Sequence, residues 1–270
     1  FERFNCNVTP IYCDMDGNFP NHFPDPTIED NISDLITLVK EKQLDAGFAF
    51  DGDADRIGVV TDRGEMLWGD QLLILFSRFI LKDNPGAVII GEVKCSQNLY
   101  DDIEKHGGRG IMWKAGHSLI KGKMKEEKAL LAGEMSGHLF FADRYFGFDD
   151  AIYASARLLE ILSKTGKKLS EILSGLPETH NTPEIRVDCP DAIKFTVVEN
   201  VKKYFKKEHK TIDIDGVRIQ FDNGWGLVRA SNTQPVLVLR FESFTREGLE
   251  TIKKKVEKIV DDCMKEVQSG

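Results

Sequence analysis

The 270-residue chain lacks several features that mark whole classes of protein. No apolar run approaches the roughly 18–20 residues that a membrane helix requires, and no secretory signal pattern stands at its beginning. Basic residues are not in excess, because 36 Lys and Arg face 44 Asp and Glu and give a formal net charge of −8. Binding to the phosphate backbone of a nucleic acid needs a basic surface, so we expect neither a nucleic acid nor a membrane as partner.

Cysteine is scarce and unpatterned. The cysteines are odd in number and no two have C-x-x-C spacing; they are Cys6, Cys13, Cys95, Cys189 and Cys263. This pattern favours reduced thiols over a disulfide framework or a zinc site, so we expect a cytoplasmic protein. The chain begins at Phe1 instead of a methionine, and we expect it to be an excerpt from a longer polypeptide.

What the chain does contain is a regular alternation of helix and strand patterns up to about residue 177. Apolar spacing predicts strands at 9–13, 45–50, 57–61, 87–93, 110–114, 129–133 and 138–142, and helices at 28–41, 70–81, 99–105, 118–128 and 149–162. Such alternation is typical of parallel sheets built from βαβ units. From about residue 178 the order changes to strand, helix, three strands and helix, which predicts an α+β domain.

Three aspartates stand at alternate positions between two predicted strands, in the acidic turn Asp51-Gly52-Asp53-Ala54-Asp55-Arg56. In a tight turn their carboxylates can converge, and they would repel one another unless a divalent cation lay among them. Mg²⁺ prefers such oxygen ligands and keeps positions open for water or phosphate. Two alternatives stay open. One is an EF-hand loop, which fits poorly because Arg56 takes the place of its glycine, and the other is a plain solvated acidic turn.

Two further polar loops each join predicted strands. The sugar loop, Gly133-Glu134-Met135-Ser136-Gly137-His138, can present a carboxylate, a hydroxyl and an imidazole together, which suits sugar hydroxyls and proton exchange. The phosphate loop, Arg229-Ala230-Ser231-Asn232-Thr233, combines a cation, hydroxyls and an amide, which suits a phosphate. Taken alone, a hairpin turn and an ordinary polar loop explain these segments equally well. Lys94 and His117 are weaker candidates, for which a surface lysine and a capping-region histidine are the default interpretations.

The three loops, in this order and at these wide separations, resemble those of the α-D-phosphohexomutase superfamily, most closely its bacterial phosphomannomutase/phosphoglucomutase branch. The similarity runs the length of the chain and includes Gly17-Asn18-Phe19-Pro20 and Phe146-Gly147-Phe148-Asp149-Asp150. It implies two three-layer α/β domains, the first of them partial, followed by an α+β C-terminal domain. On that pattern residues 1–65 would be most of domain 2, 66–177 domain 3 and 178–270 domain 4.

The resemblance also implies roles for single residues. Asp51, Asp53 and Asp55 match Mg²⁺ ligands beside Arg56, Glu134 and Ser136 match residues that bind O3 and O4 of the sugar, and Arg229, Ser231, Asn232 and Thr233 match a cradle for the phosphate that is not being transferred. Lys94, His117 and His138 match active-site positions, with His138 as a proton carrier. Ala54 is the one departure, because glycine is common there.

The implied reaction interconverts the 1-phosphate and 6-phosphate of mannose or glucose, with Mg²⁺, a phosphoserine and an intermediate such as glucose 1,6-bisphosphate. In the superfamily the phosphoserine lies in a Ser-His motif of the first domain, and no Ser-His pair occurs in this sequence. We therefore expect the isolated chain to be inactive and to need that domain of the same protein. Two other classes stay open: a non-catalytic phosphosugar-binding module, and a Mg²⁺-dependent phosphatase with Asp51 as nucleophile. The charge of Asp55, which would repel the attacked phosphate, disfavours the phosphatase.

Overall fold

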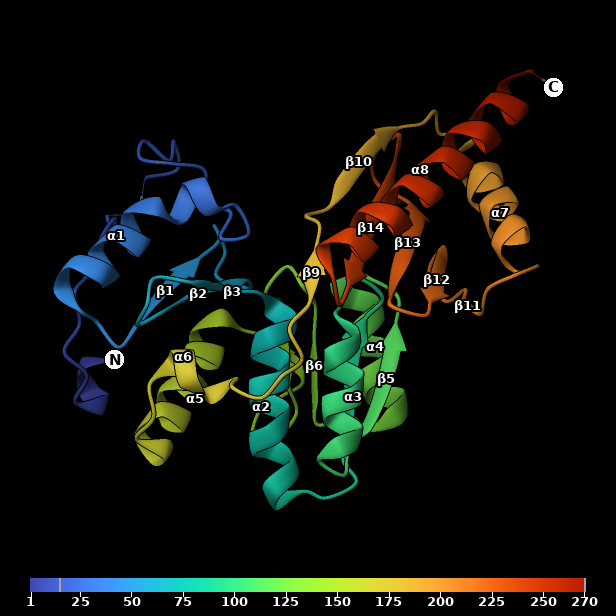
Figure 1. Cartoon of the computed structure of the whole chain (residues 1–270). Helices are drawn as coiled ribbons and strands as arrows, with labels where there is room; N and C mark the ends of the chain where they lie inside the picture. The colour runs from blue at the N-terminus through green and yellow to red at the C-terminus, as the bar shows by residue number, and fades with distance from the viewer. Residues whose placement is uncertain (15, 270) are drawn as a thin grey trace. The chain divides into compact units, whose positions relative to one another are not determined.

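The structure is a computed structural model that describes residues 1–14 and 16–269. The chain divides into two compact units, residues 1–176 and residues 177–270 (Figure 1). Across the described part of the chain, no helix has both the length and the apolar character that a bilayer crossing demands.

The first unit begins with a small antiparallel sheet in the strand order β1-β2-β3. Its elements are β1 (Ala46–Phe50), β2 (Ile57–Thr61), β3 (Met66–Leu67) and α1 (Ser33–Lys42), with short 3₁₀ turns at Glu2–Phe4 and Glu29–Ile32. Val39 of α1 packs on Val60 of β2, so the helix covers one face of the hairpin. The predicted helix and both strands around the acidic turn are confirmed.

The predicted strand at residues 9–13 was wrong, because this segment forms no strand. A strand requires a hydrogen-bonding neighbour, and none of the strands in the described residues pairs with it. The segment is tied instead by a side chain, since the hydroxyl of Tyr12 donates to the carboxylate of Asp34 in α1.

A five-stranded sheet follows, in the order β5-β4-β6-β7-β8. Its strands are β4 (Val88–Glu92), β5 (Arg109–Trp113), β6 (Leu131–Gly133), β7 (Leu139–Phe141) and β8 (Phe148–Asp149). β4 pairs in parallel with β5 and β6, whereas β6–β7 and β7–β8 are antiparallel. The expectation of a parallel sheet is therefore wrong for the β6–β7 and β7–β8 pairs, because loops as short as those between these strands can join only antiparallel neighbours.

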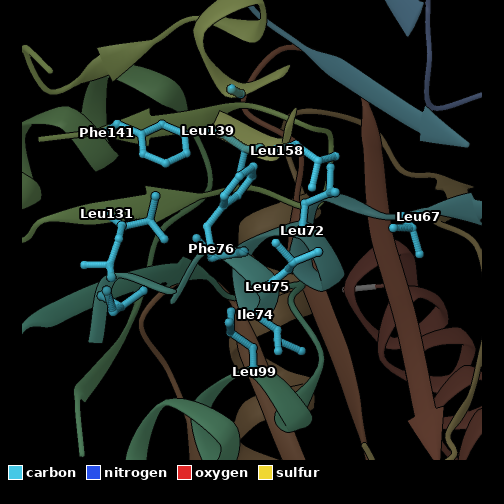
Figure 2. Packing of buried hydrophobic residues seen from close by; sticks show 14 of the residues in the cluster. Leu67, Leu72, Ile74, Leu75, Phe76, Leu99, Leu131, Leu139, Phe141 and Leu158 are labelled. Carbon is cyan, nitrogen blue, oxygen red and sulfur yellow. The ribbon is translucent and has the colours of Figure 1, made fainter. Parts of the chain in front are cut away.

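Helices cover both faces of this sheet. They are α2 (Gly69–Asp83), α3 (Gln97–Lys105), α4 (His117–Glu127), α5 (Ala151–Thr165) and the short α6 (Leu169–Ile172). Ile89 of β4 belongs to the core of α2, α3 and α5, while its neighbour Ile90 packs with Ile120 of α4 on the opposite face. Figure 2 shows the larger core, where the ring of Phe76 from α2 meets Phe141 edge-on with centroids 5.0 Å apart. The three-layer α/β architecture is confirmed for this sheet.

The second unit is an antiparallel sheet in the order β10-β14-β13-β12-β11, with β9 also paired to β14. Its elements are β9 (His180–Asn181), β10 (Ile185–Asp188), α7 (Lys194–Phe205), β11 (Thr211–Ile212), β12 (Val217–Phe221), β13 (Gly224–Ala230), β14 (Val236–Ser243) and α8 (Arg246–Ser269). Val201 of α7 and Val256 of α8 are buried with Val228, Leu239 and Phe241 of the sheet, so both helices pack on one face. The predicted α+β domain is confirmed.

Candidate active site

The acidic turn is a compact reversal between β1 and β2. Asp51 accepts hydrogen bonds at Oδ1 from the backbone N–H groups of Asp55 (3.1 Å) and Arg56 (3.0 Å), and at Oδ2 from Nε of Arg56 (2.6 Å). Ala54 has φ +59°, in the left-handed region that glycine adopts most easily. Strands flank the turn on both sides, so the EF-hand interpretation, which needs flanking helices, was wrong.

The three aspartates of the turn fit a single divalent cation. One carboxylate oxygen from each of Asp51, Asp53 and Asp55 lies within 4.8 Å of the others, so small side-chain movements would bring them to the separation of at most about 4.2 Å that octahedral Mg²⁺ allows with bonds of about 2.0–2.1 Å. Burial, followed by the neighbouring Asp51, raises the pKa of Asp55 to about 7. Burial also raises the pKa of Asp51, but the hydrogen bonds from Arg56 outweigh it and the net shift is downward. The carboxylates repel one another, and this repulsion contributes to the raised pKa of Asp55. A bound divalent cation would relieve it.

The backbone joins the acidic turn directly to the sugar loop. The N–H of Ile57 donates to the carbonyl oxygen of Gly137 (3.2 Å), and Arg56 pairs with His138 in an antiparallel bridge. Gly137 has φ +97°, and a Cβ built on it would lie 2.4 Å from the Ile57 carbonyl oxygen. Only glycine allows this approach, and it brings the aspartates of the acidic turn beside His138.

Two buried carboxylates lie at the base of the sugar loop. Glu134 accepts a hydrogen bond from the N–H of Gly116 (2.7 Å), just before α4. Glu92, fully buried at the end of β4, accepts from the N–H groups of Met135 (3.3 Å) and Lys94 (3.2 Å), and lies 3.5 Å from Nζ of Lys94. Burial, and then the charge of Glu92, raises the pKa of Glu134 to about 7. Near neutral pH Glu134 can therefore either donate or accept a hydrogen bond.

Two histidines meet around the buried carboxylate of Asp149. Nδ1 of His138 lies 3.1 Å from Oδ2 of Asp149, and Nδ1 of His117 lies 3.9 Å from the same oxygen. Lys121 donates to Oδ1 of Asp149 (3.1 Å). Burial lowers the pKa of His138, although Asp149 opposes that shift. A neutral His138 imidazole is a form that can accept a proton.

The structure thus brings together most candidates of the first unit. Asp55 Oδ1 lies 3.6 Å from His138 Nδ1, and the rings of His117 and His138 stack with centroids 6.1 Å apart. Ser136 is half-buried in the same sugar loop. Arg56 reaches back to Asp25, in the segment before α1, with 3.3 Å between Nη1 and Oδ1.

The phosphate loop lies in the second unit, where Arg229 and Ala230 end β13 and the following residues turn toward β14. Nε of Arg229 donates to Oδ2 of Asp215 (3.0 Å). Oγ of Ser231 accepts from the N–H groups of Thr233 (3.3 Å) and Gln234 (3.2 Å), which gives the loop its turn.

A buried lysine holds the backbone of this loop in place through hydrogen bonds. Nζ of Lys194 donates to the carbonyl oxygens of Ser231 (2.6 Å) and Gln234 (3.1 Å), and it pairs with Asp191 (2.6 Å). Asn232 and Thr233 stay exposed at the tip of the loop. The loop therefore offers polar groups to a ligand on a backbone that is already fixed.

Four residues of these sites were missed by the sequence interpretation. They are Glu92, Lys121, Asp149 and Lys194. Two signals were available, because Asp149 lies in the Phe146–Asp150 segment of the resemblance and Lys121 follows His117 by one helical turn. The other two are single charged residues at element ends, where sequence shows nothing unusual.

Comparison with known proteins agrees with this architecture. Sequence models of phosphoglucomutase/phosphomannomutase match the chain in series, with α/β/α domain II over residues 1–64, α/β/α domain III over 68–180 and the C-terminal domain over 184–259. A phosphomannomutase/phosphoglucomutase of Pseudomonas putida is 53% identical over 253 residues, 93% of this chain and 55% of that protein. The chain belongs to the phosphoglucomutase/phosphomannomutase family, and it spans about half the length of the curated relatives it matches.

Solved structures show the same relationship. A phosphoglucomutase/phosphomannomutase family protein from Burkholderia thailandensis superposes with a TM-score of 0.90 at 42% identity, over 97% of this chain and 56% of that one. Two structures of the Aspergillus fumigatus N-acetylphosphoglucosamine mutase share the fold at a TM-score of 0.60, with 16% and 17% identity. They cover 81% and 79% of this chain, and 48% and 51% of theirs. One is a complex with glucose 1,6-bisphosphate, the other with GlcNAc-6P and magnesium.

Proposed function

We propose that this chain is the metal-, sugar- and phosphate-binding part of a mutase that interconverts hexose 1-phosphate and hexose 6-phosphate, with mannose or glucose as the hexose. The observation that carries the proposal is the docking of the acidic turn on the sugar loop, which puts three candidate Mg²⁺ ligands beside His138. The family membership supports it, and within it we place the domains at residues 1–65, 66–177 and 178–270.

Each group of the first unit has a task in this reaction. A Mg²⁺ ion held by Asp51, Asp53 and Asp55 would neutralise charge on the transferred phosphate. Arg56 fixes the Asp51 carboxylate through its Nε, and its cation offsets part of the charge of the acidic turn. His138, neutral and only partly exposed, takes the proton from the sugar hydroxyl that attacks the phosphate.

The sugar is read at the same loop. Glu134 and Ser136 hold O3 and O4, and Lys94 and His117 add positive charge or hydrogen bonds around the ring. Because the pKa of Glu134 is raised to about 7, its carboxyl group can match a hydroxyl that donates or one that accepts. Mannose and glucose differ at C2, so contacts at O3 and O4 admit both sugars.

The phosphate loop holds the phosphate that is not being transferred, through Arg229, Ser231, Asn232 and Thr233. Its preset backbone supports this role, because phosphate binding then needs little ordering of the loop. One loop that accepts either phosphate lets glucose 1,6-bisphosphate, or its mannose counterpart, react from both ends. The Aspergillus mutase complexes with that bisphosphate and with magnesium support the same ligands here.

The phosphate donor in this proposal is a phosphoserine in a further domain of the same protein. The whole protein acts in the cytoplasm in this proposal. The isolated chain then binds substrate without turning it over. A phosphatase that uses Asp51 as nucleophile is disfavoured, because both carboxylate oxygens of Asp51 already accept hydrogen bonds within the turn.

The test follows glucose 1-phosphate and mannose 1-phosphate by ³¹P NMR with the chain, Mg²⁺ and a trace of glucose 1,6-bisphosphate. Broadened or shifted sugar-phosphate signals without conversion are expected. A Glu134→Gln variant should weaken this broadening, and inorganic phosphate should produce less of it than the sugar phosphates do. Formation of the 6-phosphate would contradict the need for a serine outside the chain. An absence of broadening with both sugars would contradict the proposed substrate class.

A further inference from the structure

A second group of potential metal ligands lies beside the acidic turn. It consists of Asp55, His138 and Asp149, whose ligand atoms all lie within 4.8 Å of one another. The three residues come from the β1–β2 turn, from the end of the sugar loop and from β8. Only Asp55 belongs also to the Mg²⁺ set of the acidic turn.

Two of the three distances between these atoms are near those around a four-coordinate metal. Nδ1 of His138 lies 3.1 Å from Oδ2 of Asp149 and 3.6 Å from Oδ1 of Asp55. A tetrahedral Zn²⁺ with bonds of about 2.0–2.1 Å places its ligand atoms about 3.3 Å apart. Three protein ligands would leave one position for water or for an oxygen of a phosphate.

The closest pair of atoms makes no hydrogen bond among the described residues. Nδ1 of His138 and Oδ2 of Asp149 are not aligned for a hydrogen bond, and neither atom finds another hydrogen-bond partner among residues 1–14 and 16–269. The Asp149 side chain is only 6% exposed. Buried polar atoms without partners are costly and rare in proteins, so their convergence points to a ligand.

The surroundings hold the ligands in place and leave a negative charge. Lys121 donates to Oδ1 of Asp149, which leaves Oδ2 facing the cluster. Metal-bound carboxylates usually carry such an outer hydrogen bond. The carboxylates of Asp51, Asp53, Asp55 and Asp149 outnumber the cations Arg56 and Lys121, so a divalent ion is attracted to the cluster.

We propose that Asp55, His138 and Asp149 form a second cation site, selective for a divalent transition metal such as Zn²⁺. The imidazole nitrogen sets its preference, because Mg²⁺ favours oxygen ligands whereas Zn²⁺ accepts nitrogen and oxygen together. An ion there would engage His138 and withdraw Asp55 from the Mg²⁺ set. If the mutase function holds, on which this consequence rests, Zn²⁺ inhibits the reaction at a site that shares only Asp55 with that of Mg²⁺.

The test is a metal titration of the chelator-stripped chain, with Zn²⁺ by calorimetry and Co²⁺ by visible absorption. Asp149→Asn should weaken Zn²⁺ binding by about tenfold or more and leave Mg²⁺ binding unchanged. The matched variant Asp53→Asn should do the reverse, because Asp53 belongs only to the acidic turn. Equal loss of both metals in Asp53→Asn would show that Zn²⁺ simply occupies the acidic turn, and unchanged Zn²⁺ binding in Asp149→Asn would also overturn the proposal.

A measurement on the unsubstituted chain covers the case of a misfolded variant. In ¹⁵N spectra of the histidine rings, Zn²⁺ should shift the Nδ1 resonance of His138, assigned by its loss in His138→Asn, while Mg²⁺ should not. An unshifted Nδ1 at stoichiometric Zn²⁺ would overturn the site. Mg²⁺ affinity and ³¹P broadening of hexose phosphates, measured without Zn²⁺, test the proposed function separately.

Discussion

The site at the acidic turn and the phosphate loop would both handle phosphate, yet they are built on opposite principles. Around the acidic turn, four carboxylates outnumber Arg56 and Lys121. In the phosphate loop each cation has an acidic neighbour, with Arg229 on Asp215 and Lys194 on Asp191. The first site therefore carries uncompensated negative charge without a bound cation. In the second, the charges are paired and the loop is held by its own contacts. The acidic-turn site should therefore respond to changes at Gly137 and to added metal ions. The phosphate loop should respond to changes in its internal ion pairs.

The largest effect should come from Gly137→Ala. Its Cβ would meet the Ile57 carbonyl oxygen at 2.4 Å in a left-handed backbone, so the turn and the sugar loop must separate. We expect a loss of about 3 kcal/mol or more in unfolding free energy. Hydrogen exchange should place the loss in residues 1–176. Gly122→Ala in α4 is the control, because no heavy atom lies within 4 Å of its Cβ. That control should gain about 0.5–1 kcal/mol, and equal behaviour of the two variants would contradict the close-contact argument.

In the second unit the corresponding test is Lys194→Met. Removing the buried ammonium leaves the carbonyl oxygen of Ser231 without its donor and that of Gln234 with only the N–H of Val236. The expected cost is about 2–3 kcal/mol in the unfolding free energy, seen as faster hydrogen exchange in residues 177–269 alone. Lys202→Met, which removes an ion pair with the exposed Glu199, should change stability by about 0.5 kcal/mol or less. A loss of stability spread evenly over both units would argue against a local stabilising role of Lys194.

Magnesium should act on the first unit only. Each tenfold rise in Mg²⁺ above its dissociation constant should add about 1.4 kcal/mol to the unfolding free energy of that unit. The effect should be stronger at pH 8 than at pH 6, because Asp55, with its pKa raised to about 7, must lose a proton to bind the ion. Asp53→Asn should abolish the response and leave the metal-free chain almost unchanged, since Asp53 is exposed. Equal Mg²⁺ protection of both units would contradict the comparison.

The smallest expected effect concerns Glu134. Its pKa is raised from 4.5 to about 7 in the folded chain, so the native state binds more protons between these values and stability falls as pH rises through this window. Glu134→Gln keeps an acceptor for Gly116 but carries no charge. Its melting temperature should exceed that of the parent chain by roughly 2–4 °C at pH 8, and the difference should vanish near pH 4.5. A constant difference at all pH values would refute this origin.

The sequence predicts the elements of this fold well where the pattern is local. The strands around Asp51–Arg56 and the helix at Gly69–Asp83 follow from short-range apolar spacing. The strand expected at residues 9–13 is absent, because a strand depends on a neighbour that apolar spacing does not reveal. The antiparallel β7–β8 edge was missed for a similar reason, since pairing direction depends on how the chain returns.

For the candidate site, the sequence reveals the loops but not what lies beneath them. Asp51, Asp53 and Asp55 stand out because three acidic residues alternate within one turn. Glu92 and Asp149 are single acids at the ends of ordinary strands, and only the folded chain buries them beside Met135 and His138. Their positions in the site depend on contacts across more than ten residues of sequence, which spacing rules cannot detect.

The left-handed conformation of Ala54 affects how the acidic turn would bind an ion. An alanine at φ +59° is less stable there than glycine by about 1 kcal/mol, and the fold has to supply that energy before any ion arrives. In return, the backbone that carries the flanking aspartates starts from one geometry, so little conformational entropy is lost on coordination. The turn is thus preorganised at the expense of folding stability. Ala54→Gly would relieve the backbone strain and hold the flanking aspartates less rigidly for binding an ion.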